Sequence, residues 1–342
     1  MNPPRTVLGS LTRITDFDQW LPEVEARPLD TWARGDYVVV EMLGDGPDRY
    51  QVETTDGSAA EMRPGDHLIG ALGTRAATLE VVGDWRDVGE DLRMQTLTRA
   101  GVLGVCTSAA LDSATLANVK YVGHAVRAGE VCTMKSFVAP ADEHELEAPL
   151  ILIIGTSMES GKTVAGVAMI RELVAMGKRV AGTKVTGVGR LRDTLAMKEA
   201  GAYLTADFVD VGLPSTVVPR DEYEQSLRLL CSKLAVTEPD VVIVEAGASP
   251  LEPYRGDVAM RVLADKVAIT VLCASDPYAV MGVIGAFDAR PDLVSGRSTS
   301  TEAGIELIDR LAGIPALNMV DRSSGPEVAA FLRENMPAGF FS

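Results

Sequence analysis

The sequence predicts an α/β fold in which a parallel sheet carries helices on both faces and is preceded by a smaller β-rich domain. Up to about residue 140, short β-rich runs are separated by Gly-Asp, Asp-Gly and Pro-Gly pairs, which is typical of a small barrel or sandwich. After Pro149, apolar runs alternate with segments of helical spacing, which is typical of βαβ units. The length of 342 residues also favours two domains.

The change of pattern places the domain boundary. We predict a β-rich domain over residues 1–140, a linker over 141–149 and the α/β domain over 150–342. The linker sequence, "ADEHELEAP", is acidic and polar and ends in proline, which suits a connecting segment.

In the first domain we expect strands at five runs bounded by turn residues. These runs are "DYVVVEML" (36–43), "RYQVETT" (49–55), "HLIGAL" (67–72), "ATLEVVG" (77–83) and "VKYVGHAV" (119–126).

In the second domain we expect strands at 150–155, 267–275 and 314–320, a strand followed by a loop in each of 179–187 and 240–249, and helices at 162–178 and 221–236. The first strand, "LILIIG", is a continuous apolar run, as expected of a strand buried on both faces. Ligands of such sheets bind at the carboxyl ends of the strands, so the loops that follow the strands are the place to look for chemistry.

Composition excludes several classes of function. The chain has 32 Lys and Arg against 48 Asp and Glu, a net charge of −16, which argues against a broad basic face for nucleic acid. The four cysteines are widely spaced and form no C-x-x-C pair, so neither a zinc ribbon nor a redox dithiol is indicated. There is no signal-peptide core and no run of roughly 18 apolar residues. We expect a cytoplasmic protein without nucleic-acid or membrane partners.

The stretch "GTSMESGKT" (155–163) joins the first strand of the second domain to its first helix. Loop N–H groups and a helix N-terminus together bind phosphate. In a loop of this pattern Lys162 reaches the β- and γ-phosphates, and the Thr163 hydroxyl binds Mg²⁺. The alternative is an ordinary strand–turn–helix joint in which Gly-Lys-Thr is accidental. We predict nucleotide contacts from Gly155, Thr156, Ser157, Met158, Glu159, Ser160, Gly161, Lys162, Thr163 and Val164.

Two further strand ends carry charged residues. Glu245 lies at the tip of an apolar strand, where it can hold a metal ion directly or through water; the alternative is an exposed carboxylate. Lys184 follows the second strand, with Asp193 close behind, and these would supply a phosphate or substrate contact and a metal ligand. The alternative for this pair is a set of solvated surface charges.

At this point the sequence resembles the dethiobiotin synthetase family. "GTSMESGKT" is similar to that family's loop, G-T-D-T-E-V-G-K-T, and "AGTKVTG…RDTL", "DVVIVEAGAS" and "IPALNMVD" are similar, in the same order, to its later motifs. The resemblance covers roughly residues 150–321. It implies ATP and Mg²⁺ as cofactors, a phosphate-contacting Lys184, Asp193 and Glu245 at the metal, and Asn318 at the nucleotide base.

Other families share this loop type. It also resembles the loop of cobyrinic acid a,c-diamide synthase and related ligases. A two-domain family with a small domain before such a loop domain is similar as well, and some of its members are implicated in D-glutamate N-acylation. The sequence departs from dethiobiotin synthetases at Ser157, where that family has aspartate, in the segment "LEPYRGDVAMR", and in having a β-rich first domain.

These observations favour an ATP- and Mg²⁺-dependent ligase or kinase that phosphorylates a carboxylate or carbamate of a small metabolite, with Lys162 and Lys184 as catalytic residues. Arg255 or Arg261 would clamp a substrate carboxylate, unless both only form surface salt bridges. The alternatives are an acyltransferase of the D-glutamate N-acylating type that uses acetyl-CoA, and a nucleotide-dependent switch. We expect a homo-oligomer.

Overall fold

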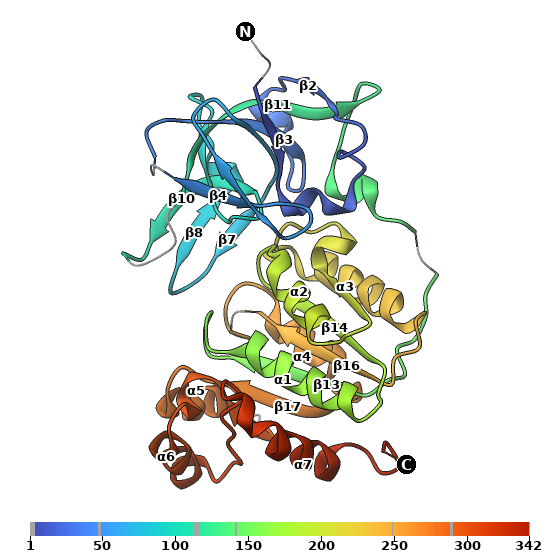
Figure 1. Ribbon diagram of the computed structural model, residues 1–342. Helices are drawn as coiled ribbons and strands as arrows, with labels where there is room; N and C mark the ends of the chain where they lie inside the picture. The colour runs from blue at the N-terminus through green and yellow to red at the C-terminus, as the bar shows by residue number, and fades with distance from the viewer. Residues whose placement is uncertain are drawn as a thin grey trace. The chain divides into compact units, whose positions relative to one another are not determined.

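The computed structural model describes residues 4–46, 49–111, 116–140, 142–247, 249–287 and 290–341 (Figure 1). The chain forms two compact units. The first comprises Met1–Pro140, Val188–Arg192 and Phe208–Val218, and the second comprises Ala141–Gly187, Asp193–Asp207 and Pro219–Ser342. The first unit thus includes two short segments that follow the predicted linker.

The first unit is a β-barrel with a hairpin. Its strands are β1 (Thr6–Leu8), β2 (Glu23–Glu25), β3 (Tyr37–Met42), β4 (Tyr50–Glu53), β5 (Ala59–Met62), β6 (His67–Leu72), β7 (Thr74–Ala76), β8 (Val81–Asp84), β9 (Arg93–Thr96), β10 (Val102–Ala109), β11 (Asn118–Arg127) and β12 (Glu130–Val131). The order β6-β3-β11-β9-β10 closes on itself because β10 also pairs with β6, which leaves no open edge in that ring. Strands β4 and β5 pair separately with each other. The five predicted strand runs are confirmed as β3, β4, β6, β8 and β11.

The second unit contains a six-stranded sheet whose pairings are all parallel. Its strands are β13 (Leu150–Gly155), β14 (Val180–Thr186), β15 (Leu204–Asp207), β16 (Val241–Ala246), β17 (Val267–Cys273) and β18 (Leu293–Ser295), in the order β15-β14-β16-β13-β17-β18. The predicted parallel sheet is therefore confirmed, with the strand before the glycine loop near its middle.

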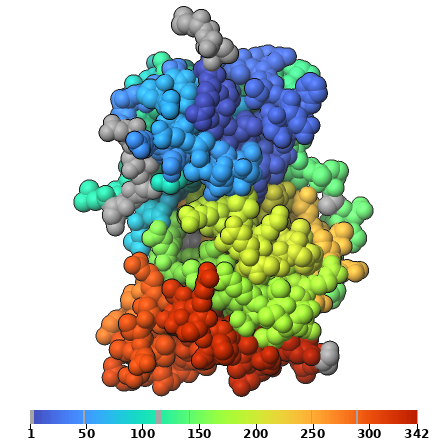
Figure 2. Space-filling model, in the orientation of Figure 1, coloured from blue at the N-terminus to red at the C-terminus, as the bar shows by residue number. Residues whose placement is uncertain are grey.

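Helices cover both faces of this sheet (Figure 1). They are α1 (Lys162–Ala175), α2 (Leu191–Glu199), α3 (Arg220–Ala235), α4 (Gly256–Leu263), α5 (Pro277–Phe287), α6 (Glu302–Ala312) and α7 (Gly325–Asn335). On one face Ile153 and Ile243 share a buried cluster with Met169 of α1, Met197 of α2 and Leu332 of α7. On the other, α3 and α4 contact each other and the β15 and β14 strands. The helices α5, α6 and α7 form the orange-to-red surface in Figure 2.

The strand predicted at 314–320 is wrong. The structure has only an isolated bridge there, between Val294 and Ala316. The chain then turns at Asn318, which accepts a hydrogen bond from the Val320 N–H through its side chain and one from the Asp321 N–H through its carbonyl. The sheet instead ends with β18, whose three residues are too few to show a period in the sequence.

A glycine after β18 supports the loop between β13 and α1. Gly296 has a φ of 91°, and a Cβ built on it would lie 2.1 Å from the Ser160 carbonyl oxygen. The neighbouring Arg297 N–H donates to that same oxygen at 3.2 Å. Only glycine therefore allows this turn to approach the loop.

We expect Gly296→Ala to lower the free energy of unfolding by about 2 kcal/mol or more, because both the backbone angle and the contact with Ser160 exclude a methyl group. Gly282→Ala is the matched control: it lies inside α5 with open space around the added methyl group and should stabilise the protein by about 0.5–1 kcal/mol. Urea unfolding measures both, and equal effects of the two substitutions would contradict this account.

Candidate functional site

The loop from Gly155 to Gly161 curls over the start of α1. A Cβ on Gly155 would lie 2.5 Å from the Ser160 Oγ, so the loop folds tightly back on the strand end. Two residues take left-handed backbone angles, Glu159 (φ 59°) and Gly161 (φ 104°), and the Glu159 side chain is exposed. The predicted nucleotide contacts from Gly155 to Val164 thus occupy one continuous turn from the end of β13 into the first turn of α1.

Several backbone N–H groups of this turn are available to a ligand. The backbone N–H groups from Met158 to Val164 donate to no other residue in the part of the chain that the structure describes. They combine the free N–H groups of a helix start with those of a curled loop, and such a set binds anions. The geometry therefore fits the phosphate-binding role expected of "GTSMESGKT".

Lys162 lies at the centre of the loop. Its Nζ donates to the Ser157 carbonyl at 2.7 Å and to the Ser160 Oγ at 3.4 Å, and the side chain is buried. Burial lowers the pKa of this ammonium, and the nearby Glu245 only partly opposes that effect. A buried cation with neutral partners favours an anionic ligand beside it.

The register of the sheet places three charged side chains next to one another at its carboxyl edge. We call Lys184, Asp207 and Glu245 the charged row. Lys184 of β14 is paired with Asp207 of β15 on one side and with Glu245 of β16 on the other. Glu245 is in turn opposite Ile153 of β13, whose side chain packs under α1. Since side chains at paired positions share a face of the sheet, all three charges lie on the face that α1 and α2 cover. Each of the three is at most 7% exposed.

Lys184 is held by carboxylates on several elements. Its ammonium forms an ion pair with Asp193, in the first turn of α2. Burial alone would lower the pKa of Lys184, but Asp193, Glu245 and Asp207 outweigh it and raise the pKa. Lys184 is therefore a fixed positive charge. Gly187 and Gly247 border its side chain, since a Cβ at these positions would lie 3.2 and 2.9 Å from the Lys184 Cε.

Glu245 faces the helix that follows the loop. The Thr163 hydroxyl donates to its Oε2 at 2.9 Å. Burial raises the pKa of Glu245, and Asp193 raises it further, while Lys184, Lys162 and Thr163 oppose the shift. A carboxylate in this position is stabilised by any added cation.

The pair fits Mg²⁺. Adjacent ligands of an octahedral ion with bond lengths of about 2.0–2.1 Å lie about 2.9 Å apart, which matches the separation of the Thr163 Oγ1 and Glu245 Oε2 atoms. Among the described residues no group of three or more His, Cys, Asp or Glu side chains forms a metal cage. Mg²⁺ does not require one, because it keeps waters and takes phosphate oxygens as ligands.

The remaining predicted residues lie outside the loop and outside the row of charges. Asn318 is half-buried in the turn beyond β18. Arg255 precedes α4 with a left-handed backbone (φ 66°), and Arg261 of α4 pairs with Glu224 of α3 on an exposed surface. Of the two arginines, only Arg255 stands in the loop region between β16 and α4.

Asp207 is a member of the row that the sequence prediction missed. It is fully buried at the last position of β15, a four-residue strand. The signal in the sequence was "LTAD", a carboxylate that ends a short β-rich run, but a run of this length resembles many turns.

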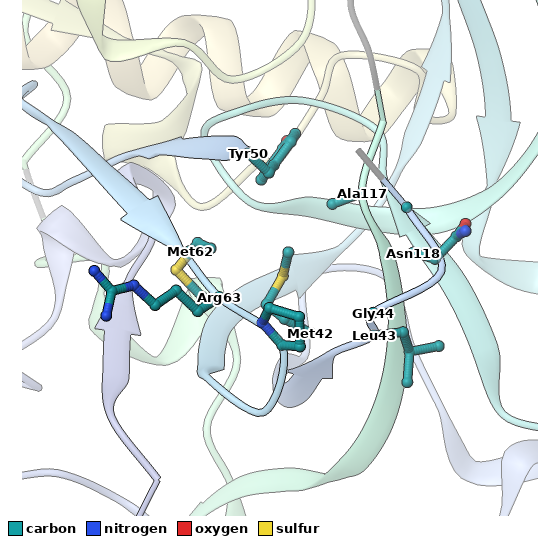
Figure 3. A pocket seen from close by; sticks show the side chains of 10 residues that line it. Met42, Leu43, Gly44, Tyr50, Met62, Arg63, Ala117 and Asn118 are labelled. Carbon is teal, nitrogen blue, oxygen red and sulfur yellow. The ribbon is translucent and has the colours of Figure 1, made fainter. Parts of the chain in front are cut away.

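The first unit has a pocket of its own, of about 160 Å³ (Figure 3). Its lining residues are Met42, Leu43, Gly44, Gly46, Tyr50, Met62, Arg63, Pro64, Ala117 and Asn118. Burial raises the pKa of Tyr50 to about 12, so its phenol stays protonated at neutral pH. Among the described residues of this lining, Arg63 is the one that carries a charge.

Comparisons with known proteins find distant structural likenesses to solved structures. No protein-family model matches the sequence, and no curated protein is significantly similar to it. Among solved structures, HypB from Helicobacter pylori in complex with nickel is 14% identical with a TM-score of 0.37, covering 56% of this chain and 91% of HypB. A DUF1611 family protein from Anabaena variabilis is 14% identical with a TM-score of 0.38, covering 57% and 62%. FtsY from Mycoplasma mycoides is 12% identical with a TM-score of 0.36, covering 58% and 73%.

The class of protein follows from the chain's own geometry. A parallel sheet, a curled glycine loop between a central strand and a helix, and a lysine and threonine at the helix start define a P-loop nucleotide-binding fold. Within the described residues, no helix combines the length and the apolar character that crossing a membrane requires.

We expect Lys162→Met to stabilise the protein by about 1 kcal/mol when no anion is present, because the substitution removes a buried cation. The same substitution should abolish the rise in melting temperature that we expect a nucleotide with Mg²⁺ to cause in the wild-type protein. Thermal unfolding with and without nucleotide measures both effects. A lower stability of the ligand-free variant would contradict the cost assigned to the buried ammonium.

Proposed function

We propose that this protein catalyses an ATP- and Mg²⁺-dependent phosphoryl transfer to a carboxylate or carbamate of a small metabolite, as a ligase or kinase. The observation that carries the proposal is Lys184, a second buried lysine at the carboxyl edge of the sheet that carries the loop. The loop itself needs only Lys162 to bind a nucleotide. The Lys184 ammonium, a second positive charge, suits a site that binds an anion in addition to the nucleotide.

The two lysines have different roles in this proposal. Lys162, with its neutral partners, would neutralise the β- and γ-phosphates of the nucleotide. Lys184, charged and held by Asp193, would contact the transferred phosphoryl group or the acceptor anion. Phosphoryl transfer depends mainly on positioning and on neutralising charge, and both lysines supply that.

Thr163 and Glu245 would hold Mg²⁺, with Asp193 as a further ligand, direct or through water. When bound, the ion neutralises charge on the phosphates and orients them. A carboxylate or carbamate acceptor is already anionic, so no residue has to remove a proton from it. This agrees with the sequence, in which the three histidines, His67, His124 and His144, all precede the loop.

The resemblance to dethiobiotin synthetases supports ATP as the nucleotide and this reaction class, with Asn318 at the base and Arg255 or Arg261 at the substrate carboxylate. Of these arginines we favour Arg255, because it lies between the end of β16 and the start of α4, at the edge of the sheet where ligands of such folds bind. We also propose that the protein acts as a homo-oligomer.

A product assay tests the proposal. With ATP and Mg²⁺, the protein should release ADP only when a carboxylated acceptor from a metabolite panel is present, and Lys162→Ala should reduce that release at least 100-fold, since the loop ammonium is lost. Slow hydrolysis without any acceptor would indicate a nucleotide switch. Release of free thiol from acetyl-CoA, without ADP, would indicate an acyltransferase. Either result would overturn the proposal.

The metal site gives a separate prediction. Glu245→Gln should weaken the response of ADP release to Mg²⁺ by about tenfold or more, since a neutral amide is a poorer ligand for a hard cation. The Thr163 hydroxyl keeps an acceptor in this variant, so the fold should persist. Titration of Mg²⁺ at saturating ATP measures the effect, with Glu224→Gln on the exposed face of α3 as the control. An unchanged Mg²⁺ requirement would remove Glu245 from the metal site.

A further inference from the structure

The carboxyl edge of the sheet has a different chemistry on the two sides of β13, the strand that leads into the loop. Strand β13 lies between β16 and β17. The charged row lies on the β16 side. On the other side, the residues that follow β17 and β18 are mostly small or carry hydroxyl groups, and they are Ala274, Ser275, Gly296, Arg297, Ser298 and Thr299. A nucleotide has a charged phosphate end and an uncharged aromatic base, so the β17 side suits the base.

The turn after β18 is fixed against the loop by its backbone. The Arg297 N–H donates to the Ser160 carbonyl at 3.2 Å, and a Cβ on Gly161 would lie 2.9 Å from the Gly296 Cα. The Ser298 N–H donates to the Ala274 carbonyl at 3.0 Å, which ties the same turn to the end of β17. The Arg297 side chain therefore begins beside the last residues of the loop.

Buried hydroxyl groups join this turn to the one that carries Asn318. The Ser295 Oγ and the Thr299 Oγ1 both donate to the Leu317 carbonyl, at 2.8 and 3.0 Å. Both hydroxyl residues are fully buried, so neither is a surface contact. Asn318 is the next residue of the chain. Arg297 and Asn318 thus lie in two turns that are bonded to each other.

The Arg297 guanidinium is available to a ligand. The residue is exposed, and within the part of the chain that the structure describes its bonds run through the backbone N–H and carbonyl only. Burial lowers the pKa of Lys162, and the charged or ionisable groups that also act on it are Glu245, Cys273, Lys184 and Glu252. Arg297 is not among them, which indicates that its cation lies away from the place where Lys162 would meet the terminal phosphates.

We propose that Arg297 is the stacking partner of the nucleotide base, with its planar guanidinium packed against the face of the purine ring. Guanidinium groups stack on aromatic rings and are attracted to them through cation–π interaction. Stacking depends on the ring face and tolerates different ring substituents, so Arg297 supplies affinity for the base and leaves the choice of base to other residues. The inference rests on the nucleotide binding in the proposed function, and it does not require the phosphoryl transfer.

The test compares a ligand that has a base with one that has none. Full-length wild-type protein and Arg297→Ala are titrated calorimetrically with ATP and with inorganic tripolyphosphate, both in the presence of Mg²⁺. We expect Arg297→Ala to weaken ATP binding about tenfold, because the stacking contact is lost, and to change tripolyphosphate binding less than twofold. Equal losses for the two ligands would make Arg297 a phosphate contact, and unchanged ATP binding would make it a surface residue. Either result would overturn the inference.

Two further variants separate stacking from charge. Arg297→Lys keeps the positive charge without the plane, so it should still bind ATP at least fivefold more weakly than the wild-type protein. Recovery of wild-type affinity in Arg297→Lys would show that charge alone is sufficient and would contradict stacking. Arg310→Ala is the matched control, an exposed arginine in the last turn of α6, and it should bind both ligands as the wild-type protein does. A loss of ATP affinity equal to that of Arg297→Ala would contradict a specific contact.

The inference and the proposed reaction fail in different ways. If ATP affinity depends on Arg297 but no acceptor leads to ADP release, the base contact stands and the proposed reaction fails. If ADP release requires an acceptor while Arg297→Ala binds ATP as tightly as the wild-type protein, the reaction stands and the base contact fails. Failure of the wild-type protein to bind either ATP or tripolyphosphate would overturn both.

Discussion

The site depends on one buried set of charges, in which Lys184 is placed between Asp193, Glu245 and Asp207. Taking an ammonium and three carboxylates out of water is costly, and only their mutual proximity offsets this cost. The three strand residues occupy paired positions on neighbouring parallel strands, so the sheet itself sets their spacing. Burial, together with the negative charge of Asp193, raises the pKa of Glu245, and a divalent cation would relieve both effects.

The loop and the charged row offer different kinds of ligand contact at the carboxyl edge of the sheet. The loop offers N–H groups and one ammonium with neutral partners, which suits phosphate. The row offers carboxylate oxygens and one ammonium with charged partners, which suits a metal ion and a second anion. The Thr163–Glu245 hydrogen bond joins the two parts, because Thr163 belongs to the helix that the loop begins and Glu245 belongs to the row.

Glycines around the site let neighbouring atoms come close to the backbone. Gly296 brings the turn after β18 against the Ser160 carbonyl, and Gly247 lets the strand end at β16 pass beside Lys184. In each place a side chain on the glycine would displace an atom on which the site depends.

The sequence by itself determined the loop, the parallel sheet and the identity of Lys184, Asp193 and Glu245 as candidates, because a buried strand, a helix start and strand-end charges are local patterns. It also located five strands of the first unit, but it left barrel and sandwich open, since closure of the barrel depends on the pairing of β6 with β10. The tertiary structure alone revealed Asp207. It joins Lys184 and Glu245 through strand register, across a long separation in the chain, and no period or motif of the sequence marks it. The strand prediction at 314–320 failed for a similar reason: β18 is only three residues long and has no period that the sequence could show.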